Sequence, residues 1–458
     1  RTFPGGTPVQ GGTLPIGQLP TATQALALVN VGRMNAMYGT DATAAMVAKL
    51  NQVMALAGGA VLQIDGDPGV RSAAAAWDAD PCSVDAANAY VAAINALVGR
   101  YHYDASTGAD LLPNLASITI VGDDEQIPFA RVPDFTPVSS EADNASALAF
   151  LTQNGNASNA TYAAALDGDV LTDDAYGAFH TRSFLGSEFF LPEVALGRLV
   201  ETPDEISAQL QRYVDAGGLL DVHTGFVTGY GFMSDGAQQM DSGLAQRIGP
   251  AGTTSNVFLR DNWSSSALAP FLDGSATPPG IDSWNAHYDF YRMAPAAYNG
   301  PADLLTTGLL PSPVTAPVFA GDILFTMGCH AGLSIPDTLA VAPADALMQR
   351  DWAQTLAQEG AAVFVGNTGY GYGSDSGVAL SERLMALFAQ HLGFSGSVGE
   401  KLLTAKNDYW SSMGEDGPYD AKSLEEATFY GLPFWRVNSP TEPQPTPPAT
   451  QPDTGGTG

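Results

Sequence analysis

The run Asp322-Ile323-Leu324-Phe325-Thr326-Met327-Gly328-Cys329-His330-Ala331-Gly332 decides the fold class of this chain. Its apolar part predicts a fully buried strand, and its glycines predict a turn directly after that strand. In open α/β sheets, ligands and reactive groups lie beyond the carboxyl ends of the strands. Cys329 stands at such a position, so we identify its thiol as a candidate nucleophile. A buried structural cysteine is the competing interpretation.

A second segment supplies the base that a cysteine nucleophile needs. The stretch Ile281-Asp282-Ser283-Trp284-Asn285-Ala286-His287-Tyr288-Asp289 predicts a short strand that ends in a polar turn. If both strands are neighbours in one parallel sheet, the His287 imidazole can take the proton of Cys329 and later protonate the leaving amine. His330 is a poorer partner, because successive residues of an extended chain point to opposite faces.

The composition excludes several classes of partner. The 458 residues include 48 acidic and 18 basic side chains, a formal net charge of −30. Nucleic acids and anionic membranes require basic surfaces, so neither is expected as a partner. No window of about 18 apolar residues predicts a membrane-spanning helix. Abundant Asp with few Lys favours a saline or calcium-rich environment, with simple solubility as the alternative.

Strands that alternate with helices divide the chain into two α/β units. Residues 1–20 are rich in Gly, Pro and Thr and predict an N-terminal arm. The first unit spans residues 21–217, and the second unit, residues 218–438, holds both reactive residues. The alternation implies parallel sheets flanked by helices. Residues 439–458 are rich in Pro and Thr and predict an extended linker toward a further module or an anchor.

Residues 135–192 are polar, and we expect them to be irregular. Four carboxylates that cluster there are candidate ligands of a structural calcium ion: Asp167, Asp169, Asp173 and Asp174. Because the spacing lacks a complete calcium-binding motif, a solvated acidic loop is the competing interpretation. No cofactor is expected to be needed for the chemistry. The other cysteine, Cys82, lies in a turn and is expected to be an isolated structural residue.

Several segments together resemble the gingipain-type cysteine peptidases of the caspase-like group. Gly328–Asp337 resembles their nucleophile segment, and Asn285–Asp289 resembles their histidine segment. Further segments match in order and spacing: Val121–Asp124, Ile127–Arg131, Val194–Arg198, Gly366–Gly373 and Tyr430–Pro433. The resemblance spans about residues 26–437 and implies a caspase/gingipain-like α/β fold of two tandem subdomains.

The resemblance also implies roles for individual residues. The backbone N–H groups of Cys329 and Tyr288 are expected to hold the oxyanion, although the better-known members have Gly where this chain has Tyr288. In these enzymes the loop after the next strand walls the pocket for the residue that precedes the scissile bond. The resulting candidates for substrate binding are Tyr370 and Tyr372, followed by Asn285, Met327 and, as a carboxylate for a basic side chain, Glu188. Asp289 is a candidate for orienting His287.

These observations predict a secreted or cell-surface cysteine endopeptidase. The Cys329 thiolate attacks a peptide carbonyl, an acyl-enzyme forms, and water hydrolyses it, so polypeptides are the expected substrates. The alternative from another class is a gingipain-like cell-surface module that binds without turnover. A metal-dependent hydrolase is less favoured, because His330 and the acidic loop lack the spacing of metal ligands.

Overall fold

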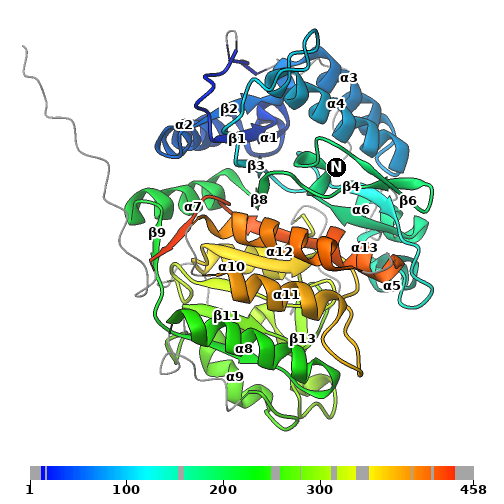
Figure 1. Cartoon of the computed structure of the whole chain (residues 1–458), viewed down its shortest axis with the longest axis vertical. Helices are drawn as coiled ribbons and strands as arrows, with labels where there is room; N and C mark the ends of the chain where they lie inside the picture. The colour runs from blue at the N-terminus through cyan, green and yellow to red at the C-terminus, as the bar shows by residue number, and fades with distance from the viewer. Residues whose placement is uncertain are drawn as a thin grey trace, which may run out of the picture.

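The computed structural model describes residues 12–15, 18–152, 159–248, 258–278, 280–310, 317–336, 350–392, 396–413 and 417–438. The predicted linker 439–458 and part of the predicted arm 1–20 lie outside these residues. A nine-stranded sheet runs through the described part of the chain (Figure 1). Its strands, in spatial order, are β10 (Gly225–Thr228), β11 (Ile281–Trp284), β15 (Ile323–Phe325), β16 (Val363–Asn367), β17 (Ala427–Gly431), β8 (Ala195–Leu199), β3 (Ser117–Val121), β1 (Ala25–Val29) and β2 (Gly59–Gln63).

The sheet has one change of direction. Neighbouring strands run parallel everywhere except at β16 and β17, which are antiparallel. The carboxyl ends of β11, β15 and β16 therefore meet at the edge where β17 begins. Because β17 pairs with both β16 and β8, strands from both predicted units share one sheet. The predicted boundary at residue 217 coincides with Gly217, whose left-handed backbone ends α7.

Helices cover both faces of the sheet. On one face α8 (Ser234–Ile248), α11 (Leu380–His391) and α12 (Val398–Ser412) lie side by side, as Figure 1 shows. Their apolar side chains share a core with α2 (Thr40–Leu56) and α7 (Pro203–Ala216). On the other face, α3 (Pro68–Ala79) and α4 (Val84–His102) cover the amino-terminal strands, while α9 (Ser265–Leu272) and α10 (Trp352–Gln358) cover the carboxyl-terminal ones. The expected α/β fold with a largely parallel sheet flanked by helices is therefore confirmed.

Local sequence signals explain where the helices begin. Thr202 caps α7, where its side chain and Glu205 form a capping box, and Pro203 occupies the first turn. Strand β1 ends at Val29. The Asn30 side chain accepts a hydrogen bond from the Arg33 N–H and starts α1 (Val31–Tyr38).

Residues 135–192 differ from the irregular segment expected from sequence. They contain α5 (Glu141–Leu148), α6 (Ala160–Asp167), β5 (Asp169–Thr172), β6 (Arg182–Phe184) and β7 (Ser187–Phe189). Strand β5 pairs with β4 (Ala130–Pro133), and α5 and α6 lie between these two strands in the chain. Short strands that pair at such a distance leave no local periodicity to detect.

The remaining elements are small and lie around the main sheet. Strands β12 (His287–Tyr288), β13 (Arg292–Ala294) and β14 (Leu305–Thr306) form an antiparallel sheet directly after β11. Strand β9 (Leu219–Asp221) pairs with β18 (Arg436–Asn438), and α13 (Pro418–Glu425) precedes β17. Among the described residues, no helix has both the length and the apolar character that a membrane crossing requires.

Candidate active site

His287 and Cys329 follow neighbouring parallel strands at the same level. In the β11–β15 pair, Ile281 stands opposite Ile323 and Ser283 stands opposite Phe325. His287 follows Ile281 by the same number of positions as Cys329 follows Ile323, so continuing the register brings the two reactive residues opposite each other. The expectation that both residues leave strands of one parallel sheet is thus met by the topology.

Asn285 and Met327, which we expected to bind substrate, instead connect the chain segments just beyond the strand ends. The Met327 N–H donates to Asn285 Oδ1 at 3.2 Å, and Asn285 Nδ2 donates to the Thr228 carbonyl at 3.0 Å. Asn285 is 0 % exposed and Met327 2 % exposed, so neither offers a surface to a ligand in this conformation. These contacts instead hold β10, β11 and β15 together where the reactive residues leave the sheet.

Continued past the strand ends, the alternation of side chains assigns the two reactive residues to one face. Ile281 and Ile323 point into the core under α8 and α11, and His287 and Cys329 have the same parity along their strands. Tyr288 and Gly328 have the opposite parity, and the Tyr288 ring packs over the backbone of Gly328. A Cβ atom at residue 328 would lie only 2.3 Å from Tyr288 Cδ2.

The packing of Tyr288 bears on the oxyanion prediction. The ring is turned toward Gly328 and Trp352, whose ring centroid is 5.7 Å away, and thus away from the face of His287. Tyr288 also belongs to β12, which pairs with β13. The larger side chain at this position is therefore accommodated by the glycine before Cys329, while the oxyanion role of the Tyr288 N–H stays a prediction.

Aromatic rings flank the His287 imidazole. The ring centroids of Tyr230 and Phe232 lie 5.9 and 5.8 Å from it, and the Tyr230 hydroxyl accepts a hydrogen bond from the His287 N–H at 3.2 Å. Partial burial lowers the pKa of His287 and favours the neutral imidazole, the form that accepts a proton. Asp289 does not orient this ring, because its carboxylate accepts from the Arg292 N–H and Nε, both at 2.7 Å.

The Cys329 thiol is partly buried and protonated in this conformation. Its Sγ donates to the Gly371 carbonyl at 3.5 Å. Burial raises the pKa of Cys329 to about 12, and the nearby carboxylates of Glu426 and Glu141 act in the same direction. Both cysteines are free thiols. Cys82 contacts a different part of the protein, where its Sγ lies 3.9 Å from the Asn159 carbonyl.

The glycine-rich loop after β16 lies directly against the Cys329 segment. The His330 N–H donates to the Gly369 carbonyl at 2.7 Å. A Cβ atom at residue 371 would lie 2.0 Å from the Met327 carbonyl oxygen, so only glycine allows this approach. The predicted pocket residues Tyr370 and Tyr372 are both partly exposed on this loop.

A buried charged cluster, which we did not predict, supports the same loop. Glu141 Oε2 lies 2.9 Å from His330 Nε2, and Glu141 Oε1 lies 2.7 Å from the Lys422 ammonium. Lys422 also contacts Asp134 at 2.6 Å and the Tyr372 hydroxyl at 3.1 Å. These residues come from the segment before α5, from α5, from the Cys329 turn and from α13, so no local pattern could have revealed the cluster.

Glu188, the predicted carboxylate for a basic substrate side chain, lies in β7 and is exposed. It lines a small depression together with Asp134, Phe135 and Lys422. The depression is therefore linked to the charged cluster through Asp134 and Lys422. The entry of a substrate side chain there, and with it the role of Glu188, stays a prediction.

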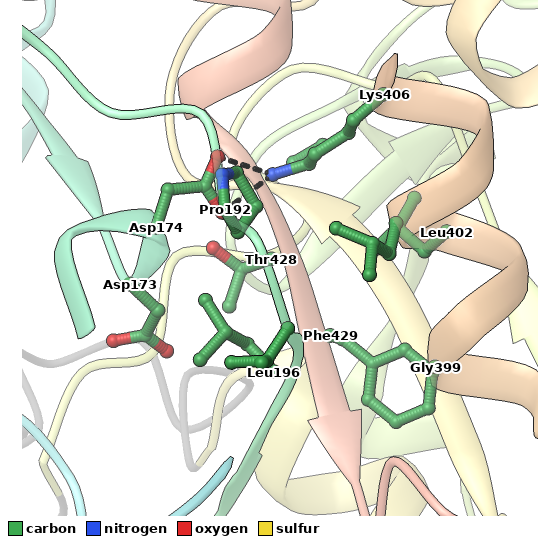
Figure 2. Close-up of a pocket in the computed structure, with 12 residues that line it drawn as sticks. Asp173, Asp174, Pro192, Leu196, Gly399, Leu402, Lys406, Thr428 and Phe429 are labelled. Atoms are coloured by element: carbon green, nitrogen blue, oxygen red, sulfur yellow. Dashed lines mark hydrogen bonds and ion pairs between the residues drawn. The ribbon is translucent and has the colours of Figure 1, made fainter. Parts of the chain in front are cut away.

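The four aspartates proposed as calcium ligands do not act together. Asp173 receives a hydrogen bond from Arg198 Nε at 2.9 Å, and Asp174 contacts the Lys406 ammonium at 2.6 and 2.7 Å. Figure 2 shows Asp174 and Lys406 joined, while Asp173 points away from Lys406. All three residues, with Leu196, line a small cavity of about 20 Å³. Asp167 is exposed and Asp169 is buried. Among the described residues, no group of three or more His, Cys, Asp or Glu side chains is arranged to hold a metal ion.

Comparisons with known proteins agree with this architecture. No protein-family model matches the chain, and no curated protein sequence matches it. The solved structure of the Arg-specific cysteine proteinase gingipain R is similar over 94 % of this chain and 80 % of its own, with a TM-score of 0.52 and 13 % identity. A complex of the gingipain pro- and mature domains from Porphyromonas gingivalis is similar over 91 % of this chain and 80 % of its own, with a TM-score of 0.53 and 13 % identity. The expected caspase/gingipain-like fold is therefore confirmed, and at this identity the likeness concerns the fold alone.

Proposed function

We propose that the chain is a cysteine endopeptidase in which His287 and Cys329 form the catalytic dyad. The observation that carries the proposal is the shared register offset: His287 and Cys329 follow the paired residues Ile281 and Ile323 of neighbouring parallel strands by the same number of positions. The likeness in fold to the cysteine proteinase gingipain R supports the same activity. Acyl transfer by a thiolate needs a nucleophile and a base in this relation, and no bound cofactor.

The proposed reaction starts from the neutral imidazole. His287 accepts the Cys329 proton once the thiol turns from the Gly371 carbonyl toward the ring, and the thiolate attacks the peptide carbonyl carbon. The imidazolium then protonates the amine as the carbon–nitrogen bond breaks, which leaves a thioester on Cys329. Neutral His287 takes a proton from water, whose oxygen attacks the thioester carbonyl carbon. The carbon–sulfur bond then breaks, the acid product leaves, and the imidazolium returns the proton to the Cys329 thiolate. Backbone N–H groups of Cys329 and Tyr288 stabilise the oxyanion in both steps.

The setting of this activity is part of the proposal. We infer that the protein acts on polypeptides outside the cell or at its surface, in agreement with a formal net charge of −30.

The test combines turnover with covalent labelling. Wild type, Cys329→Ala, His287→Ala and the control Cys82→Ala are assayed against an internally quenched peptide library and with a peptidyl acyloxymethyl ketone that alkylates attacking thiols. We expect cleavage and labelling of Cys329 in wild type and Cys82→Ala, and loss of both in the two dyad variants. Cys82→Ala retains the candidate nucleophile, so it controls for the general effect of removing a thiol. Full activity of Cys329→Ala would place the nucleophile elsewhere.

A second candidate function rests on a specific observation. The thiol is bonded to a backbone carbonyl and its pKa is raised to about 12, as in a structural cysteine. A gingipain-like surface module that binds polypeptides without turnover would have such a thiol permanently. In that case wild type gives neither cleavage nor labelling by the peptidyl reagent, although it still binds peptides.

A further inference from the structure

The Cys329 thiol contacts a loop whose position is fixed by residues from both the first and the second half of the chain. Its acceptor, the Gly371 carbonyl, belongs to the glycine-rich segment after β16. The Tyr370 N–H of this segment donates to Glu141 Oε1 at 2.8 Å, and Glu141 lies in the first half of the chain, far before Cys329. A side chain of α5 therefore sets the position of the backbone that holds the thiol.

His330 links the same carboxylate to the Cys329 turn. Its ring nitrogen lies 2.9 Å from Glu141 Oε2, its ring packs edge-on against Tyr370 at 4.5 Å, and its N–H donates to the Gly369 carbonyl. His330 has a φ of 53°, a left-handed conformation that is unfavourable for residues other than Gly, Asn and Asp. The strained turn directly after the nucleophile is thus fixed by contacts on three sides.

Lys422 completes the arrangement from α13. Its ammonium is buried and contacts Glu141, Asp134 and the Tyr372 hydroxyl, which itself donates to the Ser139 carbonyl at 2.7 Å. Burial alone would raise the pKa of Glu141, but the His330 ring and Lys422 outweigh it and lower the pKa to about 2. Glu141 therefore stays ionised at neutral pH, and its charge-assisted hydrogen bonds are stronger than neutral ones.

We propose that Glu141, His330 and Lys422 are positioning residues that hold the Gly369–Gly371 loop against Cys329, and that this loop keeps the resting thiol shielded and bonded to the Gly371 carbonyl until substrate is bound. The inference rests on the proposed peptidase function, because it assigns the loop to the reaction at Cys329. Freeing the loop has two opposite consequences. The thiol becomes hydrated and more reactive toward a small reagent, while the backbone groups that must meet a peptide carbonyl lose their position.

The test measures both consequences in the full chain with Cys82 replaced by Ser, so that only Cys329 reacts. Glu141→Ala removes every contact of the carboxylate, whereas Glu141→Gln keeps an oxygen that can accept from the Tyr370 N–H. His330→Asn removes the link from the other side with a residue that tolerates the left-handed backbone. Glu193→Gln is the matched control, because Glu193 forms a similar ion pair with His180, at 2.9 Å, on the exposed surface.

We expect Glu141→Ala and His330→Asn to react with iodoacetamide about tenfold faster than wild type and to lose at least about tenfold in kcat, with KM within about threefold. Glu141→Gln and Glu193→Gln should stay within about threefold of wild type in both measurements. A purely structural role would lower activity without raising alkylation in the folded protein. The proposal is overturned if alkylation is unchanged or slower in the folded variants, or if Glu141→Gln behaves as Glu141→Ala.

Two further measurements cover the cases in which the variants do not fold or wild type cleaves no peptide. If neither Glu141→Ala nor His330→Asn folds by circular dichroism, Tyr372→Phe takes their place, since it removes only the hydroxyl that ties the loop to Ser139 and Lys422. It should show the same opposite changes at about two- to fivefold, and no change would refute the proposal. If wild type cleaves no peptide, the alkylation rates alone decide the positioning role, so that failure of the proposed function is recognised separately.

Discussion

Replacing Gly328 by Ala tests the packing that aligns His287 with Cys329. A Cβ atom at residue 328 would lie 2.3 Å from Cδ2, 2.8 Å from Cγ and 3.1 Å from Cβ of Tyr288. Carbon atoms normally approach to about 3.5–4.0 Å, so the ring must move by more than about 1 Å. The ring cannot move freely, because it is rigid and lies against Trp352. We expect a loss of about 1–3 kcal/mol in the free energy of unfolding, the usual cost of overpacking.

The displaced ring also carries the neighbouring His287 with it. A misplacement of about 1 Å at a reacting pair can reduce the rate by about 100-fold, so we expect kcat/KM to fall by that order. Urea unfolding followed by tryptophan fluorescence and peptide turnover measure the two effects. Gly300→Ala is the control, since nothing lies within 4 Å of a Cβ atom there.

A double-mutant cycle decides whether the clash is the cause. If the clash is the cause, Gly328→Ala should lower the free energy of unfolding much less in a Tyr288→Ala background, because the ring that the new methyl group meets is absent. The coupling energy should be at least about 1 kcal/mol in the direction of compensation. A Gly328→Ala protein with unchanged stability and turnover, or a cycle with no coupling, would refute the packing that we derive.

Three other predictions concern titration and metal binding. Because burial raises the pKa of Cys329 to about 12, its alkylation by iodoacetamide should rise about tenfold per pH unit through pH 10, and a plateau near pH 8–9 would contradict the buried thiol. The pKa of Glu141 is lowered to about 2 from an ordinary 4.5, so its ion pairs stabilise the fold above pH 4.5 and this stability is lost as the pH falls toward 2. Relative to Glu141→Gln, the free energy of unfolding of wild type should fall by roughly 3 kcal/mol over that pH range, as measured by urea titrations. Parallel curves of unfolding free energy against pH for the two proteins would contradict this. If the acidic segment binds calcium, calcium should raise the melting temperature more than sodium chloride of equal ionic strength does. A calcium-specific shift that Asp167→Asn/Asp169→Asn abolishes would support binding, and equal shifts with both salts would contradict it.

The sequence predicts the sheet strands well where the signal is local. The buried strand Ile323–Phe325 lies within the apolar run that predicted it. The reactive residues could be found because each stands at the end of an apolar run. The antiparallel position of β17 could not be foreseen, since pairing direction depends on how the chain returns and not on the composition of the strand.

The supporting cluster shows the limit of such reasoning more sharply. In the sequence, Glu141 is an ordinary charged residue of a segment expected to be irregular, and Lys422 has no distinguishing pattern around it. Only the fold brings the two together beneath the Tyr370 loop. Asn285 and Met327 show the converse. Each stands two positions before a reactive residue and so has the same facing, yet residues with that facing are still inside the sheet and are buried there.

The place of β17 between β16 and β8 has a consequence for how the protein is made. During synthesis, residues 427–431 emerge long after both strands that they join, so until then β8 and β16 are open edges able to pair with other chains. Lys422 arrives with the same segment, so the nascent chain has no complete loop support either. A chain that stops at residue 416 is therefore expected to aggregate and to lack turnover, and addition of a peptide spanning residues 417–438 should reduce the aggregation. If the shortened chain is monomeric and active, β17 is not the closing strand of the nascent protein. Otherwise synthesis of residues 417–438 completes the sheet and the loop support together, so that the chain cleaves no peptide until this segment has been made.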